Sequence, residues 1–239
     1  PTSGTHDKAA RAKATRRQFL LGGAVAGVGA AAVIGLDSIL NRPDTPATAT
    51  PAAPEIATIH GGETVPFYGR HQAGIATTPQ AHATLIALDL REGSDRGALG
   101  RMMRLLSDDA ARLTQGRAAL ADSEPELAVA PARLTVTFGF GPGFVARAGG
   151  TAPPWLAPLP PFTVDRLQPE FSDGDLLLQI ASDDPLTVSH TARMLLKDTR
   201  SFATVRWVQR GFRRATGTEA SGTTMRNLFG QVDGTVNPA

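Results

Sequence analysis

The chain has 239 residues, 41% of them hydrophobic and 19% charged, so it is long enough for one or two globular domains and is not composed like a disordered protein. It contains no cysteine, which excludes disulfide scaffolds, thiolate zinc sites, iron–sulfur clusters and cysteine nucleophiles. The net charge of +2 is unevenly distributed: residues 1–49 hold six basic and three acidic residues, and residues 50–239 hold 18 and 19. The nearly neutral remainder has no basic tract, so nucleic-acid binding is not expected.

The N-terminal segment has the layout of an export signal. The pair Arg16-Arg17 follows a basic lead and precedes an uncharged stretch, residues 18–36, that is rich in Gly and Ala and only weakly hydrophobic. With the Gln-Phe-Leu that follows, this pair resembles a twin-arginine translocation signal, which implies recognition by the Tat translocase and export to the periplasm, cell surface or medium. We therefore expect residues 1–49 to be a signal peptide. The alternative is an uncleaved membrane helix, for which the stretch is at the lower length limit.

Two further regions follow the expected signal. Residues 50–65 are rich in Pro, Thr and Ala and lack periodicity, so they are expected to be a linker. Residues 66–239 are expected to form one domain. Strands are predicted over 83–90, 134–140, 175–181 and 202–209, and helices over 100–117 and 185–199.

Local signals support several of these elements. Asp184 precedes Pro185 as an N-cap residue precedes the first helical position. In the first helix, one apolar face is predicted from Met102, Leu105, Leu106, Ala110 and Leu113. Glycines at 139, 141 and 143 predict a glycine loop, and six prolines exclude regular structure over 150–172.

The order of these elements is strand, helix, strand, strand, helix, strand. This is the split βαβ, or ferredoxin-like, arrangement. We therefore predict an α+β fold with an antiparallel sheet and both helices on one face.

The segment from Met225 to Pro238 is the strongest candidate for a functional site. Gly230 and Gly234 bracket Asp233 in a stretch unsuited to a helix or a strand. From spacing alone, the simpler interpretation is an Asp233-Gly234 turn that closes a hairpin, or an Asx turn. Alternatively, the glycines let the backbone approach a flat ligand while Asp233 presents a carboxylate.

Four sequence segments together resemble the dye-decolorizing (DyP-type) haem peroxidases. Gly230-x-x-Asp233-Gly234 looks like the GxxDG signature of that family. Residues 69–75, Gly-Arg-His-Gln-Ala-Gly-Ile, resemble its G-x-H-Q-x-G-I segment at the entry into the first strand. Residues 137–142 resemble the segment after its second strand, and residues 175–180 resemble its third strand. The resemblance covers about residues 66–239, and it implies the first of two ferredoxin-like domains.

The resemblance implies a secreted enzyme that reduces hydrogen peroxide and oxidises dyes or other one-electron donors. Asp233 is then the distal acid and base above haem b, and Asp233, Gly234 and Thr235 line the cofactor. A carboxylate in a dry pocket can be tuned to move a proton between the two peroxide oxygens. Homo-oligomers are compatible with this interpretation.

The family's second domain, with the proximal His ligand and a distal Arg, is expected beyond Ala239. No metal ligand is expected within this chain, whose histidines are His6, His60, His71, His82 and His190. His71 is interpreted as structural, and His82 and His190 as solvated or capping. The fragment alone is therefore expected to be inactive.

Two other functions are compatible with the residues. One is a deferrochelatase-like protein of the same fold, which handles haem or its iron. The other is a ferredoxin-like binding module without haem.

Overall fold

The computed structural model describes residues 60–220 and 222–232. Its regular elements are β1 (His82–Leu90), α2 (Arg96–Leu113), β2 (Thr135–Phe140), α3 (Pro142–Arg147), β3 (Leu176–Ser182), α4 (Pro185–Thr199) and β4 (Ala203–Phe212). Three short 3₁₀ turns, η1 (His60–Gly62), η2 (Pro125–Ala128) and η3 (Pro169–Phe171), lie between them. The expected signal peptide, most of the linker and the residues from Asp233 onward lie outside the described residues.

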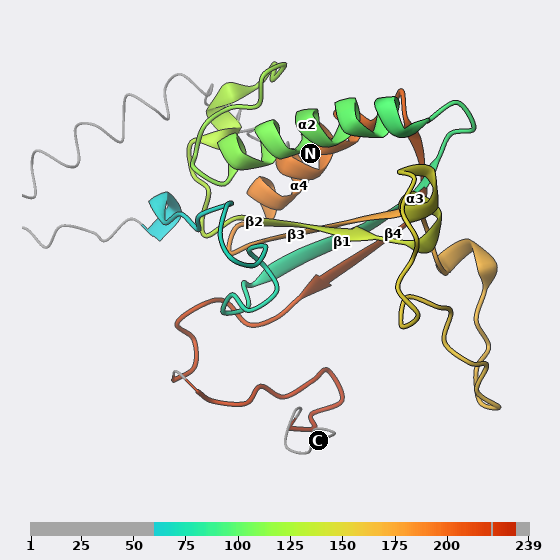
Figure 1. Cartoon of the computed structure of the whole chain (residues 1–239). Helices are drawn as coiled ribbons and strands as arrows, with labels where there is room; N and C mark the ends of the chain where they lie inside the picture. Colours follow the sequence, from blue (N-terminus) through green and yellow to red (C-terminus); the bar gives the residue numbers. More distant parts are fainter. Residues whose placement is uncertain (1–59, 221, 233–239) are drawn as a thin grey trace, which may run out of the picture. The chain divides into compact units, whose positions relative to one another are not determined.

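The strands form one antiparallel sheet in the order β2-β3-β1-β4. Helices α2 and α4 cover one face of this sheet, as Figure 1 shows. The two central strands, β1 and β3, are paired in register from His82 with Ser182 to Leu88 with Leu176. This arrangement confirms the predicted α+β, ferredoxin-like fold with both main helices on one face.

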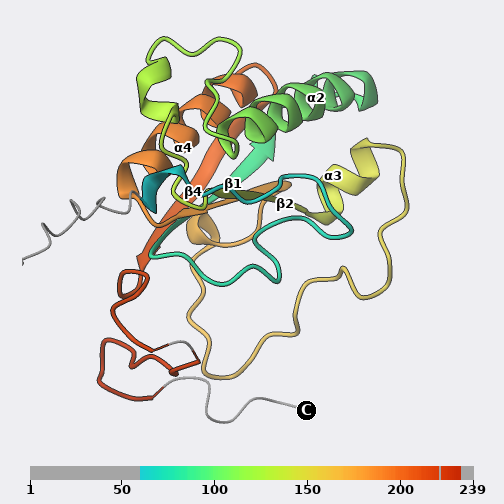
Figure 2. The same ribbon diagram turned by 90° about the vertical axis from the view of Figure 1, so that its left-hand side faces the viewer.

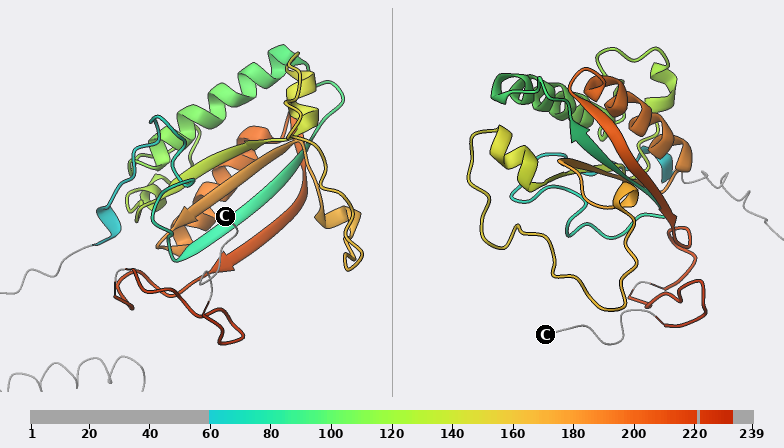
Figure 3. Two further views of the ribbon diagram at one scale, coloured as in Figure 1. Left: turned by 60° about the horizontal axis from the view of Figure 1, so that its bottom comes forward. Right: turned by 90° about the vertical axis from the view of Figure 1, so that its right-hand side faces the viewer.

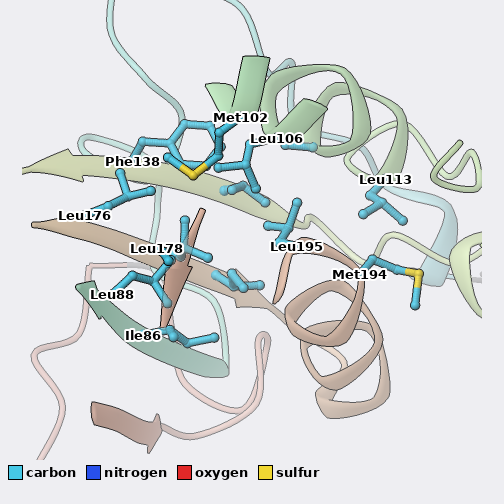
Figure 4. Packing of buried hydrophobic residues seen from close by; sticks show 14 of the residues in the cluster. Ile86, Leu88, Met102, Leu106, Leu113, Phe138, Leu176, Leu178, Met194 and Leu195 are labelled. Atoms are coloured by element: carbon cyan, nitrogen blue, oxygen red, sulfur yellow. The ribbon is translucent and has the colours of Figure 1, made fainter. Parts of the chain in front are cut away.

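The hydrophobic core lies between the sheet and these two helices. Alternate strand residues point toward the helices, among them Leu88 of β1 and Leu178 of β3, because successive side chains in a strand face opposite sides. They meet Leu106 of α2 and Leu195 of α4 (Figure 4). These four side chains are fully buried, so the core ties the helices to the centre of the sheet.

Helix α4 matches the prediction, but α2 is shifted. The Asp184 carboxylate accepts the N–H groups of Leu186 and Thr187 at 3.2 Å, so it caps α4 as predicted. Helix α2 begins at Arg96 rather than Gly100 because Asp95 caps it, accepting the Ala98 N–H at 2.7 Å. The prediction that Leu105 belongs to the apolar face was wrong, since this side chain is 40% exposed.

Two irregular regions contain more structure than predicted. The expected glycine loop continues into the short helix α3, which begins with Pro142 at a position where a missing N–H costs nothing. The proline-rich segment 150–172 contains the single turn η3. Arg206 donates to the carbonyls of Ser172 and Pro169 at 2.5 and 3.0 Å, which anchors the end of this segment to β4.

The sheet face opposite α2 and α4 carries irregular segments instead of helices. Residues 66–79, the proline-rich segment, and residues 213–220 and 222–232 lie toward this side (Figures 1 and 2). Figure 3 shows the four strands side by side from this direction. No helix among residues 60–220 and 222–232 combines the length and the apolar character needed to cross a membrane.

Candidate functional site

The segment that carries the first half of the Gly230-x-x-Asp233-Gly234 motif is a closed loop. Arg226 and Val232 form an antiparallel bridge at its base. The Gly230 N–H donates to the Asn227 carbonyl at 2.9 Å, and the Asn227 N–H donates to the Gln231 carbonyl at 2.8 Å. Gly230 has φ +81°, the left-handed conformation that completes such a three-residue turn and that favours glycine.

The Asn227 side chain holds this loop in one shape. Its Oδ1 accepts the N–H of Phe229 at 3.0 Å and the N–H of Gln231 at 3.1 Å. Arg226 donates from Nη1 to the Gly230 carbonyl at 2.8 Å. The backbone is therefore fixed through the residues directly before Asp233. Sequence reasoning singled out the glycines but missed Asn227.

Two large apolar side chains at the tip of the loop face solvent. Leu228 is 87% exposed and Phe229 is 91% exposed. An open cavity of about 1020 Å³ lies against the loop. Its lining includes Phe212, Arg213, Arg214, Met225, Arg226 and Leu228. The loop thus presents apolar and cationic groups together, which suits an apolar ligand that carries negative charges.

The predicted site residues Asp233, Gly234 and Thr235 lie outside the described residues. The described hairpin, whose tip is formed by Leu228, Phe229 and Gly230, precedes Asp233, so the interpretation of Asp233-Gly234 as a turn stays a prediction. The structure therefore describes the loop from Arg226 to Val232, which directly precedes Asp233 in the chain.

The Gly-Arg-His-Gln-Ala-Gly-Ile segment, residues 69–75, closes the free edge of the sheet. Gln72 donates from Nε2 to the Phe138 carbonyl at 2.9 Å and accepts the Phe138 N–H on Oε1 at 2.8 Å. β2 is an outer strand of the sheet, so these two bonds satisfy backbone groups that would otherwise be unpaired.

Gly74 lets the same segment lie directly on the sheet. It has φ +97°, and a Cβ there would come within 2.2 Å of the Thr137 Oγ1. The Thr137 hydroxyl donates to the Ala73 carbonyl at 2.6 Å, and Gln179 donates to the Gly74 carbonyl at 3.2 Å. Both Gln72 and Gly74 are thus structural, whereas the side chain of His71, directly before Gln72, is exposed.

Close packing also explains why glycine occupies positions 141 and 143, directly after β2. A Cβ on Gly141 would lie 2.4 Å from the Gly174 carbonyl oxygen, and one on Gly143 would lie 1.9 Å from the Asp175 carboxylate. That carboxylate accepts the Leu90 N–H at 2.8 Å. The glycine run therefore allows the close packing of β2, α3 and the start of β3.

His190 is buried, which makes the expectation of a solvated or capping residue wrong. Its Nε2 lies 2.9 Å from the Asp122 Oδ2, and only 1% of its side chain is accessible. Arg193 donates to Nδ1 at 3.2 Å, so Nε2 carries the proton and donates to Asp122. Asp122 lies 68 residues away in the chain, and sequence spacing gave no signal of this pair.

The described residues contain no cluster of three or more His, Cys, Asp and Glu side chains that could hold a metal ion. His60 and His71 are exposed, and His82 lies at the start of β1.

Comparison with protein families gives one match that spans most of the folded region. Residues 72–213 match the model of the N-terminal domain of Dyp-type peroxidases. This range ends at the residue after β4, so it covers the sheet and both main helices.

Solved structures with this fold include two close in sequence. A DyP-type peroxidase from Cellulomonas bogoriensis is 54% identical, with a TM-score of 0.73 over 76% of this chain and 51% of that one. DtpA from Streptomyces lividans, in its ferric form, is 43% identical, with a TM-score of 0.70 over 75% of this chain and 49% of that one.

Among curated proteins, deferrochelatase from Escherichia coli O157:H7 is 36% identical over 229 residues. The alignment covers 89% of this chain and 52% of the relative. The chain therefore spans about half the length of the curated relatives and of the solved structures that it matches.

Proposed function

The chain belongs to the DyP-type peroxidase family, and we propose that it is the N-terminal domain of a haem peroxidase that reduces hydrogen peroxide and oxidises dyes or other one-electron donors. The observation that carries this proposal is the loop from Arg226 to Val232, which is hydrogen-bonded into one shape directly before Asp233. Family membership and this loop together favour Asp233 as the distal acid and base.

The described residues fit one side of a haem. Leu228 and Phe229 expose apolar surface beside Gly230, and Arg213 and Arg226 supply cations suited to propionate groups. The charge of Arg214 is offset by its ion pair with Glu219. We propose that this loop, with Asp233, Gly234 and Thr235, lines haem b and that the axial ligand comes from a part of the protein beyond Ala239. When bound, the haem supplies the iron that takes up peroxide and the electrons for its reduction.

The chain's own contribution is a positioned proton carrier. The Asp233 carboxylate takes a proton from the inner oxygen of hydrogen peroxide and delivers it to the outer oxygen, which then leaves as water. Gly234 leaves room for close approach because it has no side chain. Asn227 and Arg226 act through the loop backbone, so they position the carboxylate without touching peroxide.

The test is Asp233→Asn in the full-length protein that contains this chain. The variant keeps the shape of the side chain and removes the base, so haem content should stay near the wild-type level. The rate of the peroxide reaction, followed by stopped-flow absorbance, should fall by roughly 10²–10⁴-fold, the usual share of general acid–base catalysis. Wild-type rates at full haem occupancy would show that Asp233 is only a turn residue.

A second function, removal of iron from haem, is supported by the curated relatives named deferrochelatase. Both functions would use the same pocket. Incubating the full-length haem protein with peroxide and a dye, and separately under reducing conditions without peroxide, distinguishes them: a peroxidase bleaches the dye, and a deferrochelatase releases free porphyrin.

We also propose export by the Tat pathway, with residues 1–49 as signal and 50–65 as linker ahead of the domain 66–239. Replacing Arg16-Arg17 by two lysines should hold the protein in the cytoplasm as an uncleaved precursor. Normal processing near Ala49 in that variant would exclude this route.

A further inference from the structure

Strand β4 is an outer strand of the sheet and is largely exposed beyond Ala203. Helix α4 makes its main sheet contacts with β1 and β3. Val205, Val208 and Phe212 of β4 are exposed. Between α4 and the β1–β4 edge lies a cavity of about 700 Å³, which we name the α4–β4 cavity.

The walls of this cavity are mainly apolar and come from three elements. Ile86 of β1, Val188 and Leu196 of α4, and Val208 of β4 form its apolar surface. Its volume lies within the range of sites that bind small organic molecules. Filling it with an apolar group would remove this surface from water, which favours binding.

The charged groups that line the α4–β4 cavity are cationic. They are Arg193 of α4 and Arg210 of β4, accompanied by the hydroxyls of Thr84 and Ser189. Arg193 is held by its bond to His190 and by an ion pair with Glu124, which offsets its charge. Arg210 forms no ion pair with any residue of the described part of the chain, so one guanidinium is available for an anion.

We propose that the α4–β4 cavity binds an amphipathic organic anion, with its apolar body between α4 and β4 and its carboxylate or sulfonate on Arg210. A guanidinium recognises such a group through two parallel hydrogen bonds. The occupant is a small molecule, because the apolar surface comes from three elements around one cavity of about 700 Å³ rather than from a single strand. The inference does not rest on the proposed peroxidase function, since no residue after Phe212 lines this cavity.

The test is a fluorescence titration of the full-length protein that contains this chain with anilinonaphthalene sulfonate, an apolar anion that becomes fluorescent in apolar sites. Saturable binding of one molecule per chain, displaced by dodecanoate or naphthoate, is the expected result. Dodecanol lacks the charge and should compete at least roughly tenfold less well, the loss expected for one charge-assisted contact. Comparing dodecanoate with naphthoate shows whether the cavity prefers an alkyl or an aromatic apolar group.

Two variants assign the binding to this cavity. Ser189→Trp fills it from an exposed position on α4 and should abolish binding without loss of cooperative unfolding. Arg210→Gln should weaken dodecanoate roughly tenfold. The control Arg104→Gln removes the same charge from an exposed site on α2 and should change nothing.

Three outcomes would overturn the proposal. They are non-saturable binding, binding that survives Ser189→Trp, and an equal effect of Arg104→Gln and Arg210→Gln. Size-exclusion chromatography tests whether a second copy of the chain occupies the cavity instead. A dimer that binds no dye and that Ser189→Trp dissociates would show that it does.

Discussion

Gln72 pairs with Phe138 as a neighbouring strand would, although the two residues are 66 positions apart in the chain. Its amide accepts the Phe138 N–H at 2.8 Å and donates to the Phe138 carbonyl at 2.9 Å. One side chain thereby satisfies both backbone groups of a residue on the free edge of β2. This structural role accounts for Gln72 in the segment 69–75 that resembles the family.

Replacing Gln72 by Ala should destabilise the chain by about 1–3 kcal/mol, because a part-buried N–H and C=O lose their partners. Gln72→Glu should recover only part of this, since a carboxylate accepts the N–H but repels the carbonyl. Urea unfolding at equilibrium measures both. Equal stability of wild type and Gln72→Ala would mean that water replaces the amide without cost.

Gly74→Ala should be more disruptive than an ordinary surface change. The new methyl would overlap the Thr137 Oγ1 at 2.2 Å, and the backbone would be left-handed at φ +97°. Left-handed backbone costs about 1–2 kcal/mol for a residue with a Cβ, and the overlap adds about 1–3 kcal/mol.

The matched control is Gly62→Ala, because a Cβ on Gly62 meets nothing within 4 Å. Thermal unfolding should show a clear loss for Gly74→Ala and little change for the control. A similar loss in both variants would contradict the packing explanation.

Asp198 makes the stability of the fold depend on pH. Burial, followed by the negative charge of Asp109, raises the pKa of Asp198 from 3.8 to about 7. Hydrogen bonding with Asp109 acts in the same direction, whereas Lys197 opposes it. Asp109 is itself buried between the helices and accepts the Leu120 N–H at 2.7 Å.

The sign of the pH effect follows from linkage. Between pH 3.8 and about 7 the folded chain holds a proton on Asp198 that the unfolded chain has lost. The free energy of unfolding should therefore fall as pH rises through this window. Asp198→Asn mimics the protonated form and should flatten the profile in urea unfolding; an unchanged profile would assign it to other groups.

Asn227 should affect activity without affecting the global fold. Asn227→Ala removes the acceptor for the N–H groups of Phe229 and Gln231, so the loop before Asp233 loses its fixed shape. In the full-length protein, the peroxide reaction should slow by about 10–100-fold, as for other displacements of about 1 Å at a reacting group. The midpoint of urea unfolding should not move, since the loop is exposed.

Asn227→Asp keeps the accepting oxygen and should restore most of the rate. Failure of this rescue, or a loss of stability in Asn227→Ala, would show that Asn227 does more than position the loop.

Patterns local in the sequence were sufficient for the order and type of the main elements. Asp184-Pro185 predicted the start of α4 because capping needs only residues within one turn. Alternation and short apolar runs bounded by turn residues placed each strand within a few residues, although β4 continues to Phe212 beyond the predicted 209. The order of these elements then allowed the ferredoxin-like fold to be predicted, because few topologies satisfy it.

Only the tertiary structure decided which side chains meet across long stretches of chain. The burial of His190 depends on Asp122, and the role of Gln72 depends on Phe138; neither distance in sequence carries a periodic signal. Leu105 fits the helical pattern, yet it is exposed because neighbouring elements leave that side of α2 uncovered. The α4–β4 cavity has the same origin, since α4 makes its main sheet contacts with β1 and β3 and the cavity lies between α4 and β4. Such features arise from the packing of whole elements, and local propensity does not encode that packing.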